Sequence, residues 1–371
     1  MHHLLTAVIL SATLNAPAQH SPTAPLDADH VAAFAIQLDS LRRAHHLPGL
    51  SAAVIHGDSI VYQAGFGYAD REAHQPATPA TTYRIASLTK PISSTILLGL
   101  QEDGRLSIDD SIKPYVPGYE QFFSNVSTYL LANEPDLAHL VADFDFERDD
   151  ILIRHHLTHT AEYVPGDTFK YNGFVFGTLS RLIEGQFERP FHEIVAQEVL
   201  EPLGMTSSAA SQEVAAGAAL SLLAKPYTYV PESDSFRVVD YPDPSVNAGA
   251  GIVSSVLDLA KFDAAVDANV LLSAETQAEA WSNQLDNAGE PIPYGLGWFV
   301  QERDGRSVVW HYGWQPGSFS ALYLKLPEAD LTLLLLANGE NLTAPFVEGG
   351  YGEDVFASPF AEAFYTAFAR P

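Results

Sequence analysis

The chain has 371 residues, of which 47% are hydrophobic and 18% charged, which is enough apolar material for one large domain or two smaller ones. Its formal net charge of −27 argues against nucleic-acid binding, and we interpret this charge as a solvated acidic surface. Because the chain has no cysteine, disulfides, thiol catalysis and cysteine-bound zinc are excluded. The fourteen histidines follow no metal-binding pattern, so we predict no metal and no other cofactor.

The N-terminus has the features of a secretory signal. Residues 4–14 form a short apolar stretch, and Ala-Pro-Ala at residues 16–18 is a small-residue cleavage site. We therefore predict a signal peptide at residues 1–18, a flexible mature N-terminus at residues 19–26, and export to the periplasm or the outside of the cell. No apolar run is long enough to span a bilayer, so no stable membrane insertion is expected. Residues 27–371 would form the functional domain.

The first third of the chain predicts a helix, a hairpin and a second helix. Residues 27–46 have the pattern of an amphipathic helix. Residues 51–55 and 60–64 have strand character, and the His-Gly-Asp between them favours a hairpin turn. The next helix is predicted over residues 87–104, where apolar residues recur at helical spacing and the final glycine suits a C-terminal cap.

The start of this second predicted helix contains a candidate nucleophile. Pro91 is tolerated only in the first turn of a helix, so the helix should begin close to Ser87. Ser87 and Lys90 then lie on one face, near enough to touch. Burial in this apolar helix would lower the pKa of Lys90, and a neutral amine beside a hydroxyl can activate a serine. The alternative is a capping serine beside a lysine whose ammonium reaches solvent.

The middle of the chain is mostly helical in pattern, and the last third is rich in strands. A glycine-rich loop precedes the last helix of the middle part. The predicted helices lie at residues 119–148 (one or two helices), 151–160, 175–186, 195–204 and 248–266, and the predicted strands at 294–301, 307–310, 319–326 and 331–337, before a final helix at 358–370.

This order of elements predicts an α+β fold. If the early hairpin joins the late strands, they form one antiparallel sheet with both terminal helices on one face. The helices between about residues 88 and 260 would then form a mostly helical lobe inserted in the sheet lobe. Ser87 would lie at the seam between the two lobes, where ligand sites are common.

Several stretches of the sequence, in the same order, resemble the serine β-lactamase and penicillin-binding-protein superfamily, and more closely its class C β-lactamase, esterase and D-aminopeptidase branch. The resemblance runs from about Ala32 to the C-terminus and implies a β-lactamase-like fold. Ser87-Leu88-Thr89-Lys90 resembles the Ser-x-x-Lys nucleophile motif. The other similar stretches are residues 153–160, 165–171, 202–205, 248–262, 294–298 and 310–313.

The resemblance implies a role for each matching residue. Ser87 would be the acylated nucleophile, and Lys90 its proton acceptor or electrostatic aid. Tyr171 would be the partner general base, its phenolate favoured by Lys90, because a free phenol is too weakly acidic to act as a base at neutral pH. The backbone N–H groups of Ser87 and Trp314 would form the oxyanion hole. His311, followed two residues later by Gly313, would face the substrate from the edge strand.

The sequence also departs from the family pattern, and two departures concern single residues. The motif at Tyr171 continues as Asn172-Gly173, which places Gly173 where the family has asparagine. Either Asn172 supplies the hydrogen bond to the substrate instead, or that bond is missing. His311 stands where β-lactamases have lysine and is largely uncharged at neutral pH, which favours an esterase over a β-lactamase.

A third departure concerns a whole segment. Residues 118–148 resemble an insertion, and the stretch between His159 and Tyr171 is short, so the substrate preference of the family cannot be transferred.

These observations predict an exported serine hydrolase that works through an acyl-enzyme on Ser87. Its substrate would be a small ester, amide or peptide, with an ester or small amide preferred. A D-amino-acid peptidase or a weak β-lactamase is the alternative enzyme. The alternative of another class is a catalytically inactive, penicillin-binding-like protein that binds or senses a ligand. The sequence sets no oligomeric state.

Overall fold

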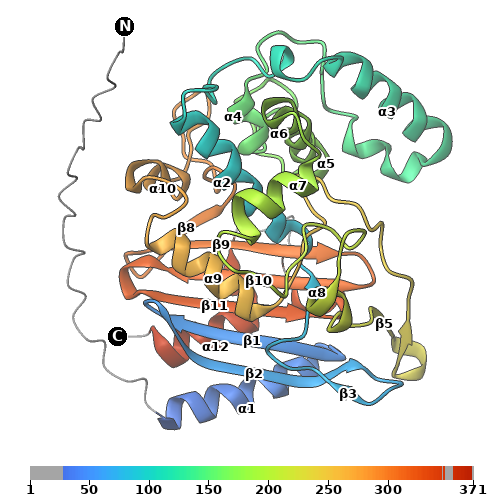
Figure 1. Ribbon diagram of the computed structural model, residues 1–371, viewed down its shortest axis with the longest axis vertical. Helices are drawn as coiled ribbons and strands as arrows, with labels where there is room; N and C mark the ends of the chain where they lie inside the picture. The colour runs from blue at the N-terminus through green and yellow to red at the C-terminus, as the bar shows by residue number, and fades with distance from the viewer. Residues whose placement is uncertain (1–27, 345, 347–353, 370–371) are drawn as a thin grey trace, which may run out of the picture.

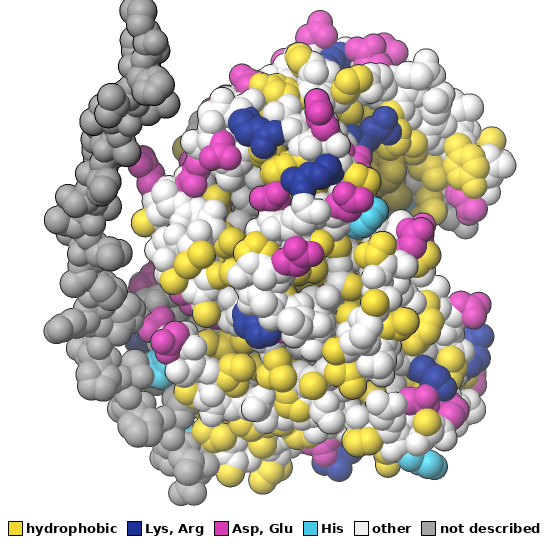
Figure 2. Space-filling model, in the orientation of Figure 1, with side chains coloured by type: hydrophobic (Ala, Val, Ile, Leu, Met, Phe, Trp, Pro, Cys, Tyr) yellow, Lys and Arg dark blue, Asp and Glu magenta, His cyan; other side chains and the backbone are white. Residues whose placement is uncertain are grey.

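A computed structural model describes residues 28–344, 346 and 354–369 (Figure 1). The predicted signal peptide at residues 1–18 and the predicted flexible N-terminus at residues 19–26 lie outside this part of the chain. Within it, no helix is both long and apolar enough to cross a bilayer. Figure 2 shows acidic side chains dispersed over the viewed face among lysines and arginines, rather than gathered in one patch.

The lower half of the molecule in Figure 1 is a seven-stranded antiparallel sheet with the order β3-β2-β1-β11-β10-β9-β8. In its centre β1 pairs with β11, from Leu50 opposite Ala337 to His56 opposite Leu331. This pairing joins the first hairpin to the last strands, so the predicted single antiparallel sheet is confirmed. The strands are β1 (Gly49–His56), β2 (Ser59–Asp70), β3 (Gln75–Pro76), β8 (Phe299–Arg303), β9 (Arg306–Gln315), β10 (Phe319–Leu326) and β11 (Leu331–Ala337).

Both faces of the sheet are buried at its centre, which explains why the sequence of β11 is almost continuously apolar. Leu333 and Leu335 point to the side covered by α1 (Ala28–Ala44) and α12 (Pro359–Phe368). Leu334 and Leu336 point to the other side, where α9 (Val256–Asp267) packs. Side chains alternate between the faces of a strand, so a strand buried on both sides is apolar at nearly every position, and Thr332 is the one polar residue of β11. The two terminal helices therefore cover one face, as predicted.

The helical part of the molecule lies above the sheet in Figure 1. It contains α2 (Thr89–Glu102), which is buried along most of its length and leads from the sheet into this part. The other helices are α3 (Tyr119–Asn133), α4 (Ile153–Leu157), α5 (Gly173–Gly177), α6 (Leu179–Phe187), α7 (Phe191–Val195), α8 (Gly217–Ser221) and α10 (Ala274–Ala280), with the short strand pairs β4 (Tyr83–Arg84) with β7 (Val253–Ser254) and β5 (Tyr227–Val230) with β6 (Ser235–Val238).

Several predicted elements have different bounds in the structure. The strand predicted at residues 294–301 begins only at Phe299, because Gly295 packs against the backbone of Ala280 and Gly297 has a φ of 87°. The helix predicted at residues 175–186 is two helices that meet at Thr178.

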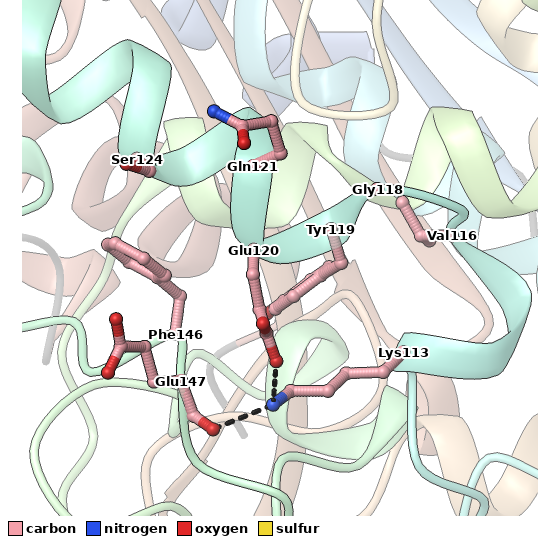
Figure 3. Close-up of a pocket in the computed structure, with 9 residues that line it drawn as sticks. All are labelled: Lys113, Val116, Gly118, Tyr119, Glu120, Gln121, Ser124, Phe146 and Glu147. Carbon is pink, nitrogen blue, oxygen red and sulfur yellow. Dashed lines mark hydrogen bonds and ion pairs between the residues drawn. The ribbon is translucent and has the colours of Figure 1, made fainter.

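The segment predicted to be an insertion, residues 118–148, contains α3 and the 3₁₀ helix η3 (Pro135–Leu140). Lys113 holds its two ends together. The Nζ atom of Lys113 donates to Glu120 Oε1 at 2.6 Å and to the carbonyl oxygen of Glu147 at 2.7 Å (Figure 3). These residues line a cavity of about 500 Å³. Inside the segment, the rings of Phe123 and Phe144 pack edge to face at 4.7 Å. The insertion is therefore packed within itself and also against the core of the helical part, where the Phe144 ring lies 5.9 Å from the ring of His156.

Candidate active site

The candidate nucleophile lies on a tight turn between β4 and α2. Ala86, Ser87 and Leu88 form a single 3₁₀ turn, η1, and α2 begins at Thr89. Ala86 has a φ of 48°, a left-handed conformation that is costly for a residue with a side chain and that recurs at functional sites. The side chain of Ser87 is half-buried. The turn therefore holds the Ser87 hydroxyl at the N-terminal end of α2. The sequence predicts that the helix starts close to Ser87, and α2 begins two residues later, at Thr89.

Strand β9 approaches this turn closely enough to require a glycine. A Cβ atom on Gly313 would lie 2.2 Å from the carbonyl oxygen of Ile85, far inside van der Waals contact. Gly313 itself is paired with Ala321 of β10. The sheet lobe and the nucleophile turn thus meet at Gly313, which gives this residue a backbone role at the predicted seam.

Lys90 is buried beside Ser87. Its Nζ atom lies 2.8 Å from Ser87 Oγ and 3.0 Å from the carbonyl oxygen of Gly249, and its side chain has no exposed surface. Burial lowers the pKa of Lys90 to about 7, because the ammonium loses its hydration. An amine with a pKa close to neutrality can accept a proton from the serine hydroxyl and return it.

Two glycines, Gly177 and Gly249, allow the Gly249 carbonyl group to reach Lys90. A Cβ on Gly249 would lie 2.6 Å from the carbonyl oxygen of Gly173, and a Cβ on Gly177 would lie 2.8 Å from Asn247 Oδ1. Asn247 Oδ1 also accepts a hydrogen bond of 2.8 Å from the Gly249 N–H, which fixes the turn. Helix α5 and this turn therefore pack backbone against backbone, and side chains at these positions would push the Gly249 carbonyl away from Lys90.

The ring of Tyr171 also lies beside Lys90. The Lys90 Nζ is 5.0 Å from the centre of the Tyr171 ring and 5.5 Å from that of Phe176. The Tyr171 ring also contacts the rings of His159 at 4.4 Å and Tyr312 at 5.8 Å. The structure therefore brings Tyr171 to Ser87 and Lys90, although it lies on a separate segment of the chain. The role of Tyr171 as a general base remains a prediction.

The comparisons with known proteins agree with this geometry. The model of the family described as Beta-lactamase matches residues 30–355. The chain belongs to the β-lactamase family. Penicillin-binding protein 4* of Bacillus subtilis (strain 168) is 26% identical over 326 residues, which cover 82% of this chain and 71% of that protein. Protein flp of Staphylococcus aureus is 24% identical over 79% of this chain, but the match spans only 60% of that protein.

Solved structures share the fold. The octameric penicillin-binding protein homologue from Pyrococcus abyssi superimposes with a TM-score of 0.68 over 91% of this chain and 80% of that chain, at 22% sequence identity. The predicted β-lactamase-like fold is therefore confirmed. Within the described residues, no group of three or more histidine, aspartate or glutamate side chains is arranged to hold a metal ion.

Asn172 does not have the position expected of a substrate-binding residue in this family member. Its Oδ1 caps α5 by accepting from the N–H groups of Phe174 and Val175, at 3.0 and 3.1 Å. Its Nδ2 donates to the carbonyl oxygen of Leu140 at 2.7 Å and to Glu162 Oε2 at 3.1 Å. The amide is fully used inside the protein, which corrects the expectation that it binds substrate.

Gly173, and not Asn172, is the residue beside Lys90. A Cβ atom on Gly173 would lie 3.4 Å from Lys90 Nζ. This contact supports the alignment that places Gly173 where the family has asparagine. No side chain of the Tyr171-Asn172-Gly173 motif other than the tyrosine therefore points at Lys90.

His311 also differs from the expectation that it faces the substrate from the edge strand. The pairing of β9 with β8 extends no further than Trp310, which lies opposite Phe299, the first residue of β8. His311 therefore has no partner on that side, yet its side chain has no exposed surface. Its Nδ1 donates to the carbonyl oxygen of Tyr312 at 2.7 Å, and its Nε2 accepts from the Tyr294 hydroxyl at 2.9 Å. Tyr294 belongs to the irregular stretch before β8, which folds over the ring.

The electrostatics of His311 do agree with the sequence. Burial, followed by the nearby Lys90, lowers the pKa of His311 well below 6.5. The ring is therefore neutral, as predicted from the replacement of lysine, but it is a buried neighbour of the site rather than an exposed one. Tyr294 was not singled out from the sequence, because only its contact with His311 distinguishes it.

Trp314, the predicted second contributor to the oxyanion hole, lies in β9 directly after Gly313. It is paired with Ser320 of β10, and its side chain is half-buried. Since Gly313 touches the backbone of Ile85, the backbone of Trp314 lies near the Ser87 turn. The pairing of the Ser87 and Trp314 N–H groups as an oxyanion hole remains a prediction.

The insertion is tied to the segment that carries Tyr171. Lys170 Nζ forms ion pairs with Asp143 and with Glu162, each at 2.8 Å. Glu162 is only 2% exposed and also accepts from Asn172, as described above. Lys170 lowers the pKa of Asp143, which keeps this carboxylate charged. The insertion thus forms one side of the Tyr171 segment, a role that the sequence did not indicate.

Proposed function

We propose that this member of the β-lactamase family is a serine hydrolase that forms an acyl-enzyme on Ser87. The observation that carries the proposal is the buried Lys90 Nζ, 2.8 Å from Ser87 Oγ, with a pKa lowered to about 7 by burial. At neutral pH about half of the lysine is then neutral. A penicillin-binding-like protein that only binds or senses a ligand has no need of a buried lysine beside a serine, because burying this group is unfavourable.

The reaction follows from these positions. The neutral Lys90 accepts the hydroxyl proton of Ser87 while Oγ attacks the carbonyl carbon of the substrate. The proton then passes to the leaving alcohol or amine, directly or through Tyr171 on the other side of the Nζ atom. In the second half, a water molecule gives a proton to the same pair and attacks the acyl-enzyme, which releases the acid and restores Ser87. The N–H groups of Ser87 and Trp314 would stabilise the oxyanion in both halves.

Neutral esters or small amides are the substrates that the surroundings favour. An anionic substrate needs a persistent cation, and the histidine at the position of the family's lysine is neutral and buried. The net charge of −27 also repels anions. The Asn172 amide is engaged inside the protein and is not offered to a substrate amide. A D-amino-acid peptidase or a weak β-lactamase remains the alternative, and such an enzyme would prefer anionic peptides or β-lactams over neutral esters.

We also propose that the protein is exported, on the basis of the signal-like residues 1–18. N-terminal sequencing of protein recovered from the periplasm or the medium would test this directly. Recovery of the full-length chain from the cytoplasm alone would refute it.

Covalent labelling tests the nucleophile. A fluorophosphonate probe should label the wild type on Ser87, and Ser87→Ala should remove both the label and ester hydrolysis. Ser93→Ala is the matched control, because Ser93 is a buried serine of the same helix whose hydroxyl donates to the Thr89 carbonyl oxygen at 2.9 Å. This control should keep the label. Mapping of the label to another residue would refute the proposal, and a panel of neutral esters and cephalosporins would decide between the substrate classes.

A further inference from the structure

His159 accepts hydrogen bonds from the backbone on both sides of Tyr171. Its carbonyl oxygen accepts a hydrogen bond from the Lys170 N–H at 2.8 Å, and its ring Nδ1 accepts one from the Asn172 N–H at 3.1 Å. One residue therefore accepts hydrogen bonds from the N–H groups of both residues that adjoin Tyr171 in the chain. Between these two bonds, the His159 ring lies against the Tyr171 ring, with the ring centres 4.4 Å apart and the planes tilted by 36°.

The backbone conformation of His159 allows both of these hydrogen bonds to form. It has a φ of 56°, and a left-handed conformation is uncommon in a residue other than glycine. His159 follows α4, and this conformation presents its carbonyl group and its ring to the same stretch of chain. Strained conformations of this kind persist only where the surroundings hold them in place.

The ring is held in one tautomer and one orientation. Because Nδ1 accepts a hydrogen bond from a backbone N–H, the neutral ring carries its proton on Nε2. Burial, followed by the charge of Lys90 and then by His311, keeps the pKa of His159 well below 6.5, so this neutral form persists. The ring is enclosed by Tyr294 at 4.9 Å and Phe176 at 5.2 Å as well as by Tyr171.

A comparison with His155 shows what is specific to His159. His155 is also buried, and its Nδ1 accepts from a backbone N–H, that of Leu152, at 3.1 Å. That bond closes the first turn of α4 and does not involve the Tyr171 segment. The same chemistry is therefore used once for a helix end and once beside the candidate base.

We propose that His159 is a positioning residue for Tyr171, which it holds beside Lys90 through the Nδ1 bond to Asn172 and through ring contact. The proposal rests on the proposed function of Tyr171 in proton transfer. It predicts that loss of the Nδ1 acceptor impairs the reaction only as long as Tyr171 is present.

Two substitutions separate the acceptor from the ring. His159→Phe keeps an aromatic ring but removes the acceptor, and His159→Asn keeps an acceptor oxygen and tolerates the left-handed conformation. We expect His159→Phe to lower kcat for a neutral ester on the order of 100-fold with little change in KM, since small displacements of catalytic groups have effects of this size. His159→Asn should lose less. Rates are expressed per active site, counted by the end point of fluorophosphonate labelling, so that partial unfolding does not affect them.

A double variant gives the decisive measurement. If His159 acts through Tyr171, His159→Phe combined with Tyr171→Phe should be no slower than Tyr171→Phe alone. His155→Phe, the matched control, should lower the melting temperature but leave kcat per active site unchanged. A His159→Phe variant within twofold of the wild type, or fully multiplicative losses in the double variant, would overturn the proposal.

The result also distinguishes this proposal from the proposed function. If the wild type is not labelled, or Tyr171→Phe keeps full activity, then the proposed function itself fails. If labelling and the Tyr171 effect are both present and only the His159 variants behave as the wild type, then the positioning role alone is wrong.

Discussion

The gap between Gly173 and Lys90 allows a charge to be placed beside the proposed proton acceptor, Lys90. A Cβ atom at residue 173 would lie 3.4 Å from Lys90 Nζ, an ordinary contact distance, and Gly173 has no left-handed φ that would forbid a side chain. Gly173→Asp and Gly173→Asn introduce side chains of the same shape that differ only in charge. We predict that the aspartate raises the pKa of Lys90 and that the asparagine does so much less.

The expected shift can be worked from the structure. A carboxylate within 4–6 Å of an ammonium raises its pKa by roughly 1–3 units, from the value of about 7 that burial gives Lys90. Reaction through the neutral amine would then be about 5- to 500-fold slower at pH 7 in Gly173→Asp, because the neutral fraction falls by this factor. Above the new pKa the two variants should converge.

The assay is the pH dependence of kcat/KM for a neutral ester between pH 5 and 10, per labelled active site. The wild type should show an acidic limb near pH 7, and Gly173→Asp a limb displaced to higher pH relative to Gly173→Asn. The pKa values of His159 and His311, two histidines of the site, lie well below 6.5, so their titration is separate from the limb expected near pH 7. Identical acidic limbs in the two variants would refute the assignment of Lys90 as the proton acceptor.

Two further predictions concern the same site. Lys90→Met should abolish activity but stabilise the fold by up to about 5 kcal/mol at pH 7. Because the pKa of Lys90 in the folded protein, about 7, lies below its ordinary value of 10.5, the free energy of unfolding of the wild type should rise with pH between these values. Denaturant unfolding at pH 7 and pH 10 that shows no such rise would contradict this. Gly313→Ala should lower kcat/KM on the order of 100-fold by displacing the Ser87 turn. The control Gly99→Ala, in an open position of α2, should leave kcat/KM unchanged and raise the melting temperature. Equal activity of the two variants would show that β9 does not hold the turn.

Local patterns sufficed to predict the framework of the fold. The alternation and apolar runs of β1 and β11 indicated one antiparallel sheet, and the position of Pro91 located the nucleophile turn to within two residues. Such features depend on a few neighbouring residues. The family resemblance then supplied the β-lactamase-like arrangement of the helical part, which the patterns alone leave open.

The environment of single side chains could not be predicted in the same way. Whether His311 is exposed depends on where β8 begins and on Tyr294, which reaches the ring from 17 residues away. Whether Asn172 or Gly173 meets Lys90 depends on the turn of α5, because neighbouring residues on a helix point in different directions. The sequence did not indicate the role of His159, because its bonds to the residues around Tyr171 depend on how two segments 13 residues apart fold together.

The pairing of β1 with β11 has a consequence for how the protein acquires its site. The two central strands lie at opposite ends of the chain, with Leu50 opposite Ala337, so the sheet cannot close during synthesis until the last strands have left the ribosome. β9, which supports the Ser87 turn, is also made late. Bringing such distant segments together is slow, because a long loop must be ordered before the contacts form. The Ser87 turn therefore stays without the support of β9 until the strands of the last third of the chain have been made.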